Sequence, residues 1–319
     1  MDVHDKVAII TGSAQGLGRA FAVRLLEAGV RVCLSDVNTD KGEKTLKELE
    51  GRFGKKNVCF VQCDVTLEEE FKILFDKAEE YFQVACVDIL TNNAGVNCNL
   101  GWRKCMNINI MGVMTGTEIA MERMKKSGKP CQIINTASIG NSIFEKCSIF
   151  KISTLFPAGL VTDTGESDWL VSYMVSKHGV VALTRSLASC SYNIQHKAIC
   201  PSFADTEIVS SGLENENEIG RAKGLQTIKD LGGLMTPEFV AEGFFQLLTE
   251  VDNGAVMVAF KDAPYIMMPD YSKFLFFAMV ALSKLLSKTF APRLVTGKHL
   301  LVSLVFVILA LFFMMTLLI

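Results

Sequence analysis

Short apolar runs alternate with longer segments of helical periodicity along the first two-thirds of the chain. Each run ends at, or just before, a polar residue, which is typical of strands buried in a parallel sheet. The predicted strands are Lys6–Thr11, Val30–Ser35, Asn57–Gln62, Val87–Thr91 and Cys131–Ala137. The predicted helices are Leu17–Ala28, Asp40–Phe53, Leu67–Phe82, Trp102–Lys125 and Val171–Ser191. This alternation predicts an α/β fold, a doubly wound parallel sheet of the Rossmann type, with ligands at the carboxyl ends of the strands.

A glycine-rich turn follows the first predicted strand and opens the first predicted helix. Gly12 allows a tight turn, Gly16 lets backbone N–H groups approach a phosphate, and Gly18 lets the helix pack closely on the strand. Gln15 and Leu17 lie in the same turn and complete the predicted phosphate site. The spacing G-x-x-x-G-x-G differs from the commoner G-x-G-x-x-G, so a purely structural turn is the alternative.

Asp36 follows the second predicted strand, at the place of a carboxylate that accepts hydrogen bonds from an adenosine ribose. A 2′-phosphate would meet this negative charge, so the predicted cofactor is NAD rather than NADP. Arg19 is a cation that could still assist a phosphate. An ordinary turn residue at the end of a strand is the alternative interpretation of Asp36.

Tyr173 and Lys177 lie four residues apart in a predicted helix and therefore face the same way. A free phenol has a pKa of about 10, which is too high for a good base at neutral pH. A nearby ammonium and a cationic nicotinamide both stabilise the phenolate. Of the five tyrosines, only Tyr173 has a lysine four positions later. The pair predicts an enzyme that takes the proton from an alcohol while hydride moves to a nicotinamide.

These residues resemble the motifs of the short-chain dehydrogenase/reductase family, over residues 1 to about 260. The similar pieces are TGSAQGLG at 11–18, Asp36, CDV at 63–65, NNAG at 92–95, NIN at 107–109, TAS at 136–138, YMVSK at 173–177 and Pro201–Thr206. The resemblance implies that Ser138 holds the substrate oxygen for Tyr173. It also implies that Lys177 binds the nicotinamide ribose and that Asn109 holds a relay water.

The same resemblance implies cofactor contacts from Asp64, Val65, Asn93, Tyr173 and Thr206. It also implies a homodimer formed by the helices after the fourth and fifth strands. The implied reaction is NAD-dependent oxidation of a secondary alcohol on a lipophilic substrate to the ketone. Prostaglandin-type hydroxylated eicosanoids are the first expectation, and steroid or retinoid alcohols are the second. A non-catalytic NAD-binding membrane protein is the rival from another class.

Three features depart from the family's pattern. The stretch between Ser138 and Tyr173 is longer by roughly twenty residues, at about 141–169, and is interpreted either as a lid or as an artefact of gene prediction. Leu170 stands near the place of a substrate-contacting glutamine, which puts the exact substrate in doubt. Ser202 replaces the glycine usual after Pro201, and its Cβ is expected to restrict the loop over the nicotinamide.

The last twenty residues, Leu300–Ile319, carry no charged side chain. At about 1.5 Å per residue they would span roughly 30 Å, so they predict a transmembrane anchor, with a buried helix of a soluble protein as the alternative. The basic linker at 263–299 predicts that the catalytic domain, 1–262, is cytoplasmic and anchored in an intracellular membrane, the endoplasmic reticulum first.

Composition narrows the possible partners and ligands. A net charge of −2 with no basic block disfavours nucleic acid as a partner. The ten cysteines and four histidines form no metal-ligand spacing, so no metal is expected.

Overall fold

One compact unit, Met1–Met268, contains every part of the chain that the structure describes. The described parts of the computed structural model are residues 2–97, 100–139, 168–190, 193–215, 217–261 and 265–267. Three predicted segments lie wholly or almost wholly outside them: the extra stretch at about 141–169, the linker at 263–299 and the anchor at 300–319. The domain boundaries drawn from these segments stay predictions.

The apolar composition of 300–319 predicts a chain anchored by its C-terminus in an intracellular membrane. Among the residues that the structure describes, however, no helix has both the length and the apolar character needed to cross a bilayer. This finding contradicts the predicted membrane location, and we withdraw that assignment. The helix Asp168–Ala188 is long, but it contains Lys177 and Arg185, and charged side chains in the middle of a helix oppose insertion.

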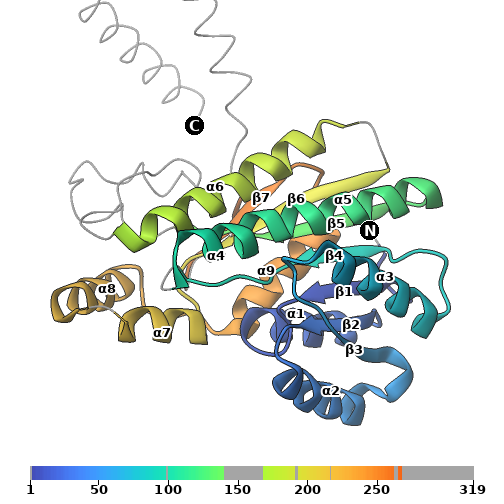
Figure 1. Cartoon of the computed structure of the whole chain (residues 1–319), viewed down its shortest axis with the longest axis horizontal. Helices are drawn as coiled ribbons and strands as arrows, with labels where there is room; N and C mark the ends of the chain where they lie inside the picture. The colour runs from blue at the N-terminus through green and yellow to red at the C-terminus, as the bar shows by residue number, and fades with distance from the viewer. Residues whose placement is uncertain are drawn as a thin grey trace, which may run out of the picture. The chain divides into compact units, whose positions relative to one another are not determined.

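A single sheet forms the centre of the fold (Figure 1). Its strands are β1 Val7–Thr11, β2 Arg31–Asp36, β3 Val58–Gln62, β4 Ile89–Asn92, β5 Cys131–Thr136, β6 Ile194–Pro201, β7 Val256–Ala259 and β8 Ile266–Met267. The order across the sheet is β3-β2-β1-β4-β5-β6-β7-β8. Every neighbouring pair is parallel except β7 with β8. The predicted doubly wound parallel sheet is therefore confirmed.

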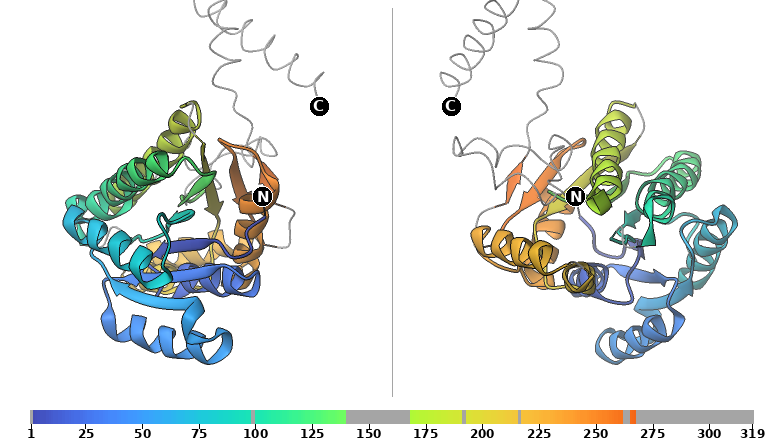
Figure 2. Two further views of the ribbon diagram at one scale, coloured as in Figure 1. Left: turned by 90° about the vertical axis from the view of Figure 1, so that its right-hand side faces the viewer. Right: turned by 60° about the vertical axis from the view of Figure 1, so that its left-hand side comes forward.

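Helices cover both faces of this sheet (Figure 2). They are α1 Gly16–Glu27, α2 Thr39–Phe53, α3 Glu68–Phe82, α4 Trp102–Met106, α5 Gly112–Ser127, α6 Asp168–Ala188, α7 Glu207–Glu214, α8 Glu218–Asp230 and α9 Pro237–Glu250. Helices α1, α2 and α9 share one buried apolar cluster with the sheet, and α3 shares another on the opposite face. Residues of α5 and α6 build a third cluster with β6, β7 and the segment that follows β5.

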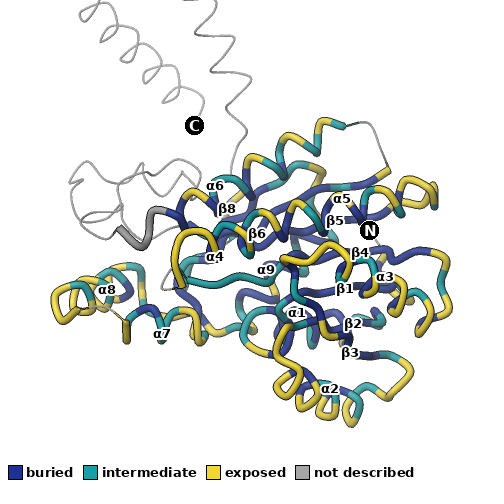
Figure 3. Tube along the Cα trace, viewed as in Figure 1, coloured by how far each residue is buried: buried dark blue, intermediate teal, exposed yellow. Residues whose placement is uncertain are grey.

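The burial pattern follows this layering (Figure 3). Strands β1, β4 and β5 are buried along their whole length, while the outer turns of α2 and α8 are exposed. Phe21 of α1 and Phe244 of α9 stack with ring centroids 4.3 Å apart, which fixes these helices against each other. The strand order reverses direction between β1 and β4, so the crevice at the carboxyl ends of these two strands is where a doubly wound sheet binds ligands.

Candidate active site

The glycine turn closes tightly around the end of β1. Gly12 has a φ of +64°, and a Cβ on it would lie 2.7 Å from the Cα of Ala94. A Cβ on the buried Gly18 would strike the carbonyl oxygen of Gly12. Gly16 also has a positive φ, +57°, which L side chains rarely adopt. The turn thus presents backbone at the N-terminus of α1, and this is the geometry that a pyrophosphate needs.

Asp36, the last residue of β2, faces this turn. Its carboxylate accepts hydrogen bonds from the N–H of Ala14 at 3.1 Å and from the N–H of Asn38 at 3.0 Å. Asp36 is only partly buried, so its oxygens remain reachable for a ribose hydroxyl. Arg19, the cation considered above for a phosphate, instead pairs with Glu48 of α2. The residues present therefore fit the adenosine half of NAD.

Asn93 ties the end of β4 to the turn. Its side-chain N–H₂ donates to the carbonyl oxygens of Thr11 and Gly12, both at 3.0 Å. Its side-chain oxygen accepts from the hydroxyl of Thr136 at 3.2 Å. The Thr11 hydroxyl oxygen in turn accepts from the backbone N–H groups of Asn93 and Ala94, each at 3.1 Å. One polar network therefore spans the ends of β1, β4 and β5 across the switch point.

Lys177 reaches the same edge from α6. It is only 4% exposed, and its Nζ donates to the carbonyl oxygen of Thr136 at 2.8 Å. The Nζ also lies 5.8 Å from the ring centroid of the half-buried Tyr173, one helical turn earlier. A buried ammonium is costly unless it is hydrogen-bonded, and here the Thr136 carbonyl stabilises it. The structure thus brings together the phenol and the ammonium that the spacing predicts.

Asn109 lies in a π-helical turn, η3 Asn107–Met111, between α4 and α5. Its side chain is fully buried. The amide oxygen accepts from the N–H of Val96 at 2.8 Å, and the amide N–H₂ donates to the Val96 carbonyl at 2.9 Å and to the Ser176 hydroxyl at 3.3 Å. Asn109 therefore fixes the loop after β4 against the helix that carries Tyr173, whose carbonyl accepts from Ser176 at 2.7 Å.

The side chains of Asn109 and Lys177 both reach Gly95. A Cβ built on Gly95 would lie 3.4 Å from the Asn109 side-chain oxygen, 3.5 Å from the Lys177 Nζ and 3.8 Å from the Asn93 carbonyl oxygen. Three polar atoms thus converge on the same side of Gly95, where a larger residue would lie against all of them. The arrangement suits the relay that the family resemblance implies for Asn109.

Ser138 lies two residues beyond the Thr136 carbonyl that accepts from Lys177, and it is half-buried. The flanking backbone N–H groups of Ala137 and Ile139 donate to β6 carbonyl oxygens of Ile199 and Pro201. Beneath this segment, burial raises the pKa of the Cys200 thiol to about 12, so Cys200 stays protonated and is no nucleophile. The backbone bonds on either side of Ser138 therefore hold it at the same edge of the sheet that the Lys177 side chain reaches.

The remaining predicted contacts lie around the rim. Asp64 accepts from the N–H and the hydroxyl of Thr66, at 2.9 and 2.7 Å, so one of its oxygens is engaged at the start of α3. Val65 is buried and packs directly against Gly112 of α5. A Cβ added to Gly112 would lie 2.9 Å from the Val65 side chain. The side chain of Thr206 lies beside the turn, 3.4 Å from a Cβ built on Gly16.

Ser202 takes the place of the family's glycine without strain. Its N–H donates to the carbonyl oxygen of Ala259 at 2.9 Å. Its φ does not lie in the left-handed region, unlike the φ angles of Asp5 and Gln83. The expected restriction of the loop is therefore not a backbone conflict. The side chain of Leu170 lies outside the described residues.

The predicted set omits several residues of the network. Thr11, Gly95 and Thr136 stand inside the quoted motifs, so the signal was available, but their backbone and hydroxyl roles appear only in three dimensions. Lys41 and Glu207 contact Gln15 of the turn, and no motif marks either of them.

The fold is a parallel sheet with a glycine-rich turn after β1, an aspartate at the end of β2, and a helix that carries a tyrosine and a lysine one turn apart. These features together define a nicotinamide-dependent oxidoreductase of the short-chain type. A family profile described as short chain dehydrogenase matches residues 6–146. The chain belongs to this family, since it is 36% identical over 266 residues to a relative from Bos taurus, covering 81% of this chain and 91% of that protein.

That relative is 15-hydroxyprostaglandin dehydrogenase [NAD(+)], and the predicted resemblance to the short-chain dehydrogenase/reductase family is confirmed. The chain is also 30% identical over 247 residues to 3beta-hydroxysteroid dehydrogenase 2 of Eggerthella lenta, covering 74% of this chain and 85% of that protein. Among solved structures, a short chain dehydrogenase/reductase from Burkholderia phymatum in complex with NAD is similar, with a TM-score of 0.63 and 26% identity, covering 81% of this chain and 90% of that one.

Proposed function

We propose that this chain catalyses the NAD-dependent oxidation of a secondary alcohol on a lipophilic substrate to the corresponding ketone. The observation that carries the proposal is the buried Lys177 ammonium, 5.8 Å from the Tyr173 ring centroid and bonded to the Thr136 carbonyl. This pair lies at the same edge of the sheet as the glycine turn. Bound NAD supplies the acceptor for the hydride, and the chain supplies the base.

In this mechanism the Tyr173 oxygen takes the proton of the substrate hydroxyl. Lys177 favours the phenolate because an adjacent positive charge stabilises the anionic form. Ser138 holds the substrate oxygen by a hydrogen bond, and Lys177 also contacts the nicotinamide ribose. Asn109, whose side-chain oxygen lies on the same side of Gly95 as the Lys177 Nζ, holds the water that passes the proton onward from Lys177. Asp36, Asp64, Val65, Asn93 and Thr206, with the glycine turn, hold the dinucleotide.

We infer a preference for NAD over NADP. A 2′-phosphate needs free cations beside the adenosine ribose, but Asp36 places a carboxylate there. Arg19 is paired with Glu48, and Lys41 is paired with Glu207 at 2.8 Å. The NAD-dependent relative from Bos taurus and the NAD complex from Burkholderia phymatum support this choice.

Prostaglandin-type hydroxylated eicosanoids are the first substrate class, supported by the 36% identity to 15-hydroxyprostaglandin dehydrogenase. Steroid alcohols are the second class, supported by the 30% identity to 3beta-hydroxysteroid dehydrogenase 2. Both are lipophilic secondary alcohols. Comparing kcat/KM for a 15-hydroxyprostaglandin and a 3β-hydroxysteroid on the same preparation separates the two.

Replacing the phenol tests the proposed chemistry. Purified Tyr173→Phe should still bind NADH, because the glycine turn and Asp36 are intact, but it should lower kcat by about 10²–10⁴-fold, the usual contribution of a positioned acid or base. Formation of NADH with a panel of lipid alcohols gives the rate. Tyr81→Phe is the matched control, because Tyr81 lies on α3, is exposed, and donates to the Lys55 carbonyl away from the site; its kcat should not change.

The rival interpretation, a protein that binds NAD without catalysis, makes a different prediction. It requires NADH binding with no turnover of any lipid alcohol in the wild type. Equal rates for wild type and Tyr173→Phe would also contradict the proposed base.

A further inference from the structure

Helices α7 and α8 form a flap whose two ends leave and rejoin the fold at one place. The backbone N–H of Asp205 donates to the Met235 carbonyl, and the N–H of Met235 donates to the Phe203 carbonyl, both at 2.8 Å. Ala204 and Met235 form a parallel bridge at the same point and are buried. Both ends of the α7–α8 flap are thus fixed together, while the helices project from one end of the fold (Figure 1).

Three exposed side chains join the flap to the nucleotide site. The Gln15 amide donates to the Glu207 carboxylate at 2.5 Å, and the Lys41 ammonium donates to the same carboxylate at 2.8 Å. The Lys41 ammonium also donates to the Gln15 amide oxygen at 2.7 Å. Lys41 and Gln15 lower the pKa of Glu207, so its carboxylate carries charge at neutral pH.

Each member of this cluster comes from a different part of the site. Gln15 is the N-cap of α1 in the glycine turn, Lys41 lies in the first turn of α2, and Glu207 is the first residue of α7. The preceding Thr206 lies against Gly16 of the turn. The cluster therefore joins the flap to the backbone on which a pyrophosphate would rest.

We propose that Gln15, Lys41 and Glu207 form a latch that holds the α7–α8 flap closed over bound dinucleotide and slows its release. The inference rests on the proposed use of NAD. A second contact, from the Asn97 amide to the Ser211 hydroxyl at 3.0 Å, holds the middle of α7, so the latch governs the end of α7 nearest the phosphates.

The sign of one mutant effect separates this latch from simple electrostatics. If Glu207 acted only as a negative charge near the phosphates, its removal would tighten NADH binding and slow dissociation. If Glu207 holds the flap closed, its removal frees the flap and accelerates dissociation. Glu207→Gln keeps the size of the side chain and removes only the charge.

The test is stopped-flow dissociation of NADH from the full chain, followed by nicotinamide fluorescence at several ionic strengths. Because exposed ion pairs are individually weak, Glu207→Gln and Lys41→Met should each accelerate release about two- to fivefold. The double variant should release NADH no faster than either single variant, since both break one latch. Wild-type release should accelerate with added salt, and release from Glu207→Gln should not.

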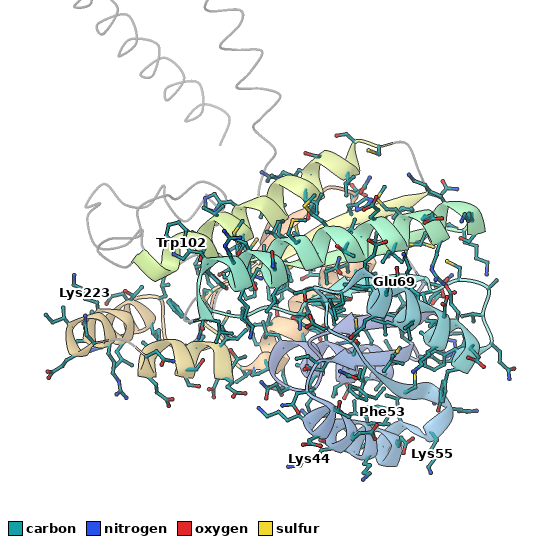
Figure 4. The ribbon with its side chains drawn as sticks, in the orientation of Figure 1. Lys44, Phe53, Lys55, Glu69, Trp102 and Lys223 are labelled. Atoms are coloured by element: carbon teal, nitrogen blue, oxygen red, sulfur yellow. The ribbon has the colours of Figure 1, made fainter. Side chains whose placement is uncertain are left out.

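Two control variants carry matched charge changes. Glu218→Gln removes a carboxylate from the first turn of α8, and Lys44→Met removes an ammonium that points outward from α2 (Figure 4); both should release NADH at the wild-type rate. Slower or unchanged release from Glu207→Gln would overturn the latch alone. A wild type that binds no NADH would overturn the proposed function and the latch with it.

Discussion

At the scale of single residues, Gly18 in the first turn of α1 has the least room for a side chain among the three glycines of the turn. A Cβ on Gly18 would strike the Gly12 carbonyl oxygen and come within 2.5 Å of the Asn93 side-chain nitrogen. Both atoms belong to the network that joins β1 to β4. Gly51, in contrast, lies on the exposed face of α2 with no atom within 4 Å of its position for a Cβ.

The two glycines make a matched pair for substitution. Gly18→Ala should weaken NADH binding by at least tenfold and lower stability by about 1–3 kcal/mol, because backbone must move to admit the methyl group. Gly51→Ala should leave NADH binding unchanged and raise stability by about 0.5 kcal/mol, since alanine loses less backbone entropy in a helix. NADH titration and urea unfolding measure both; a Gly18→Ala variant with wild-type affinity would contradict the argument.

Single residues also mark the limit of sequence-based prediction. Tyr173 and Lys177 were predictable because four residues of helix place two side chains on one face. Lys41 and Glu207 are 166 positions apart, and nothing in their local sequence indicates a shared contact. Only the fold brings them together, because the carboxyl edge of a parallel sheet collects loops from distant parts of the chain.

At the scale of elements, hydrophobic periodicity located β1–β5 and the helices up to α6, but it did not mark β6–β8 or α7–α9, and it missed one irregularity. It predicts one helix over Trp102–Lys125, whereas the structure has α4, the π-helical turn η3 and then α5. The spacing of apolar residues does not reveal a single π-helical turn inside a longer helix. The physical reason for the turn lies outside the helix, since the Asn109 side chain bonds to the backbone of Val96 and such bulges are frequent at functional sites.

Strand β6 carries a buried cation that the chemistry does not use. Lys197 is 1% exposed, and burial lowers its pKa from 10.5 to about 8. Its Nζ donates to the Leu248 carbonyl near the end of α9 at 3.1 Å. The amide of Gln132 donates to the same oxygen at 3.1 Å, so that carbonyl keeps a donor if Lys197 is replaced.

Lys197→Met should therefore stabilise the protein at neutral pH. Below about pH 8 the lysine is charged in both states, and folding carries a penalty on the order of 3 kcal/mol. The free energy of unfolding of the wild type should rise between about pH 8 and 10.5, because the folded state releases the Lys197 proton first. Below pH 8, Lys197 should contribute no pH dependence to the stability. Urea unfolding across this range checks both points; a variant that keeps the same rise would contradict the assignment to Lys197.

At the scale of the whole molecule, the parallel sheet explains why so much of the site was predictable. Every polar strand end named from the sequence lies at one edge, because strands that run the same way end on the same side. The α7–α8 flap was not predictable in the same way. The acidic stretch Glu214–Glu218 suggests only a turn in sequence, whereas in the structure α7 ends at Glu214, α8 begins at Glu218, and the chain on either side of the two helices meets at the Ala204–Met235 bridge.

The predicted homodimer, formed by α5 and α6, belongs to this scale. Three large apolar side chains on or beside these helices are exposed: Met111 by 51%, Met114 by 43% and Val175 by 53%. Their burial against a second copy would remove apolar surface from water. Light scattering should therefore give the wild type twice the mass of one 35.1 kDa chain.

Val175→Arg should shift this dimer to the monomer, because an unpaired charge buried in an interface costs several kcal/mol. Ile73→Arg is the control, since Ile73 is similarly exposed, at 47%, but lies on α3, away from the predicted interface. Its mass should equal that of the wild type. A wild type that scatters as a single chain, or a Val175→Arg variant that remains a dimer, would show that these helices do not form the interface.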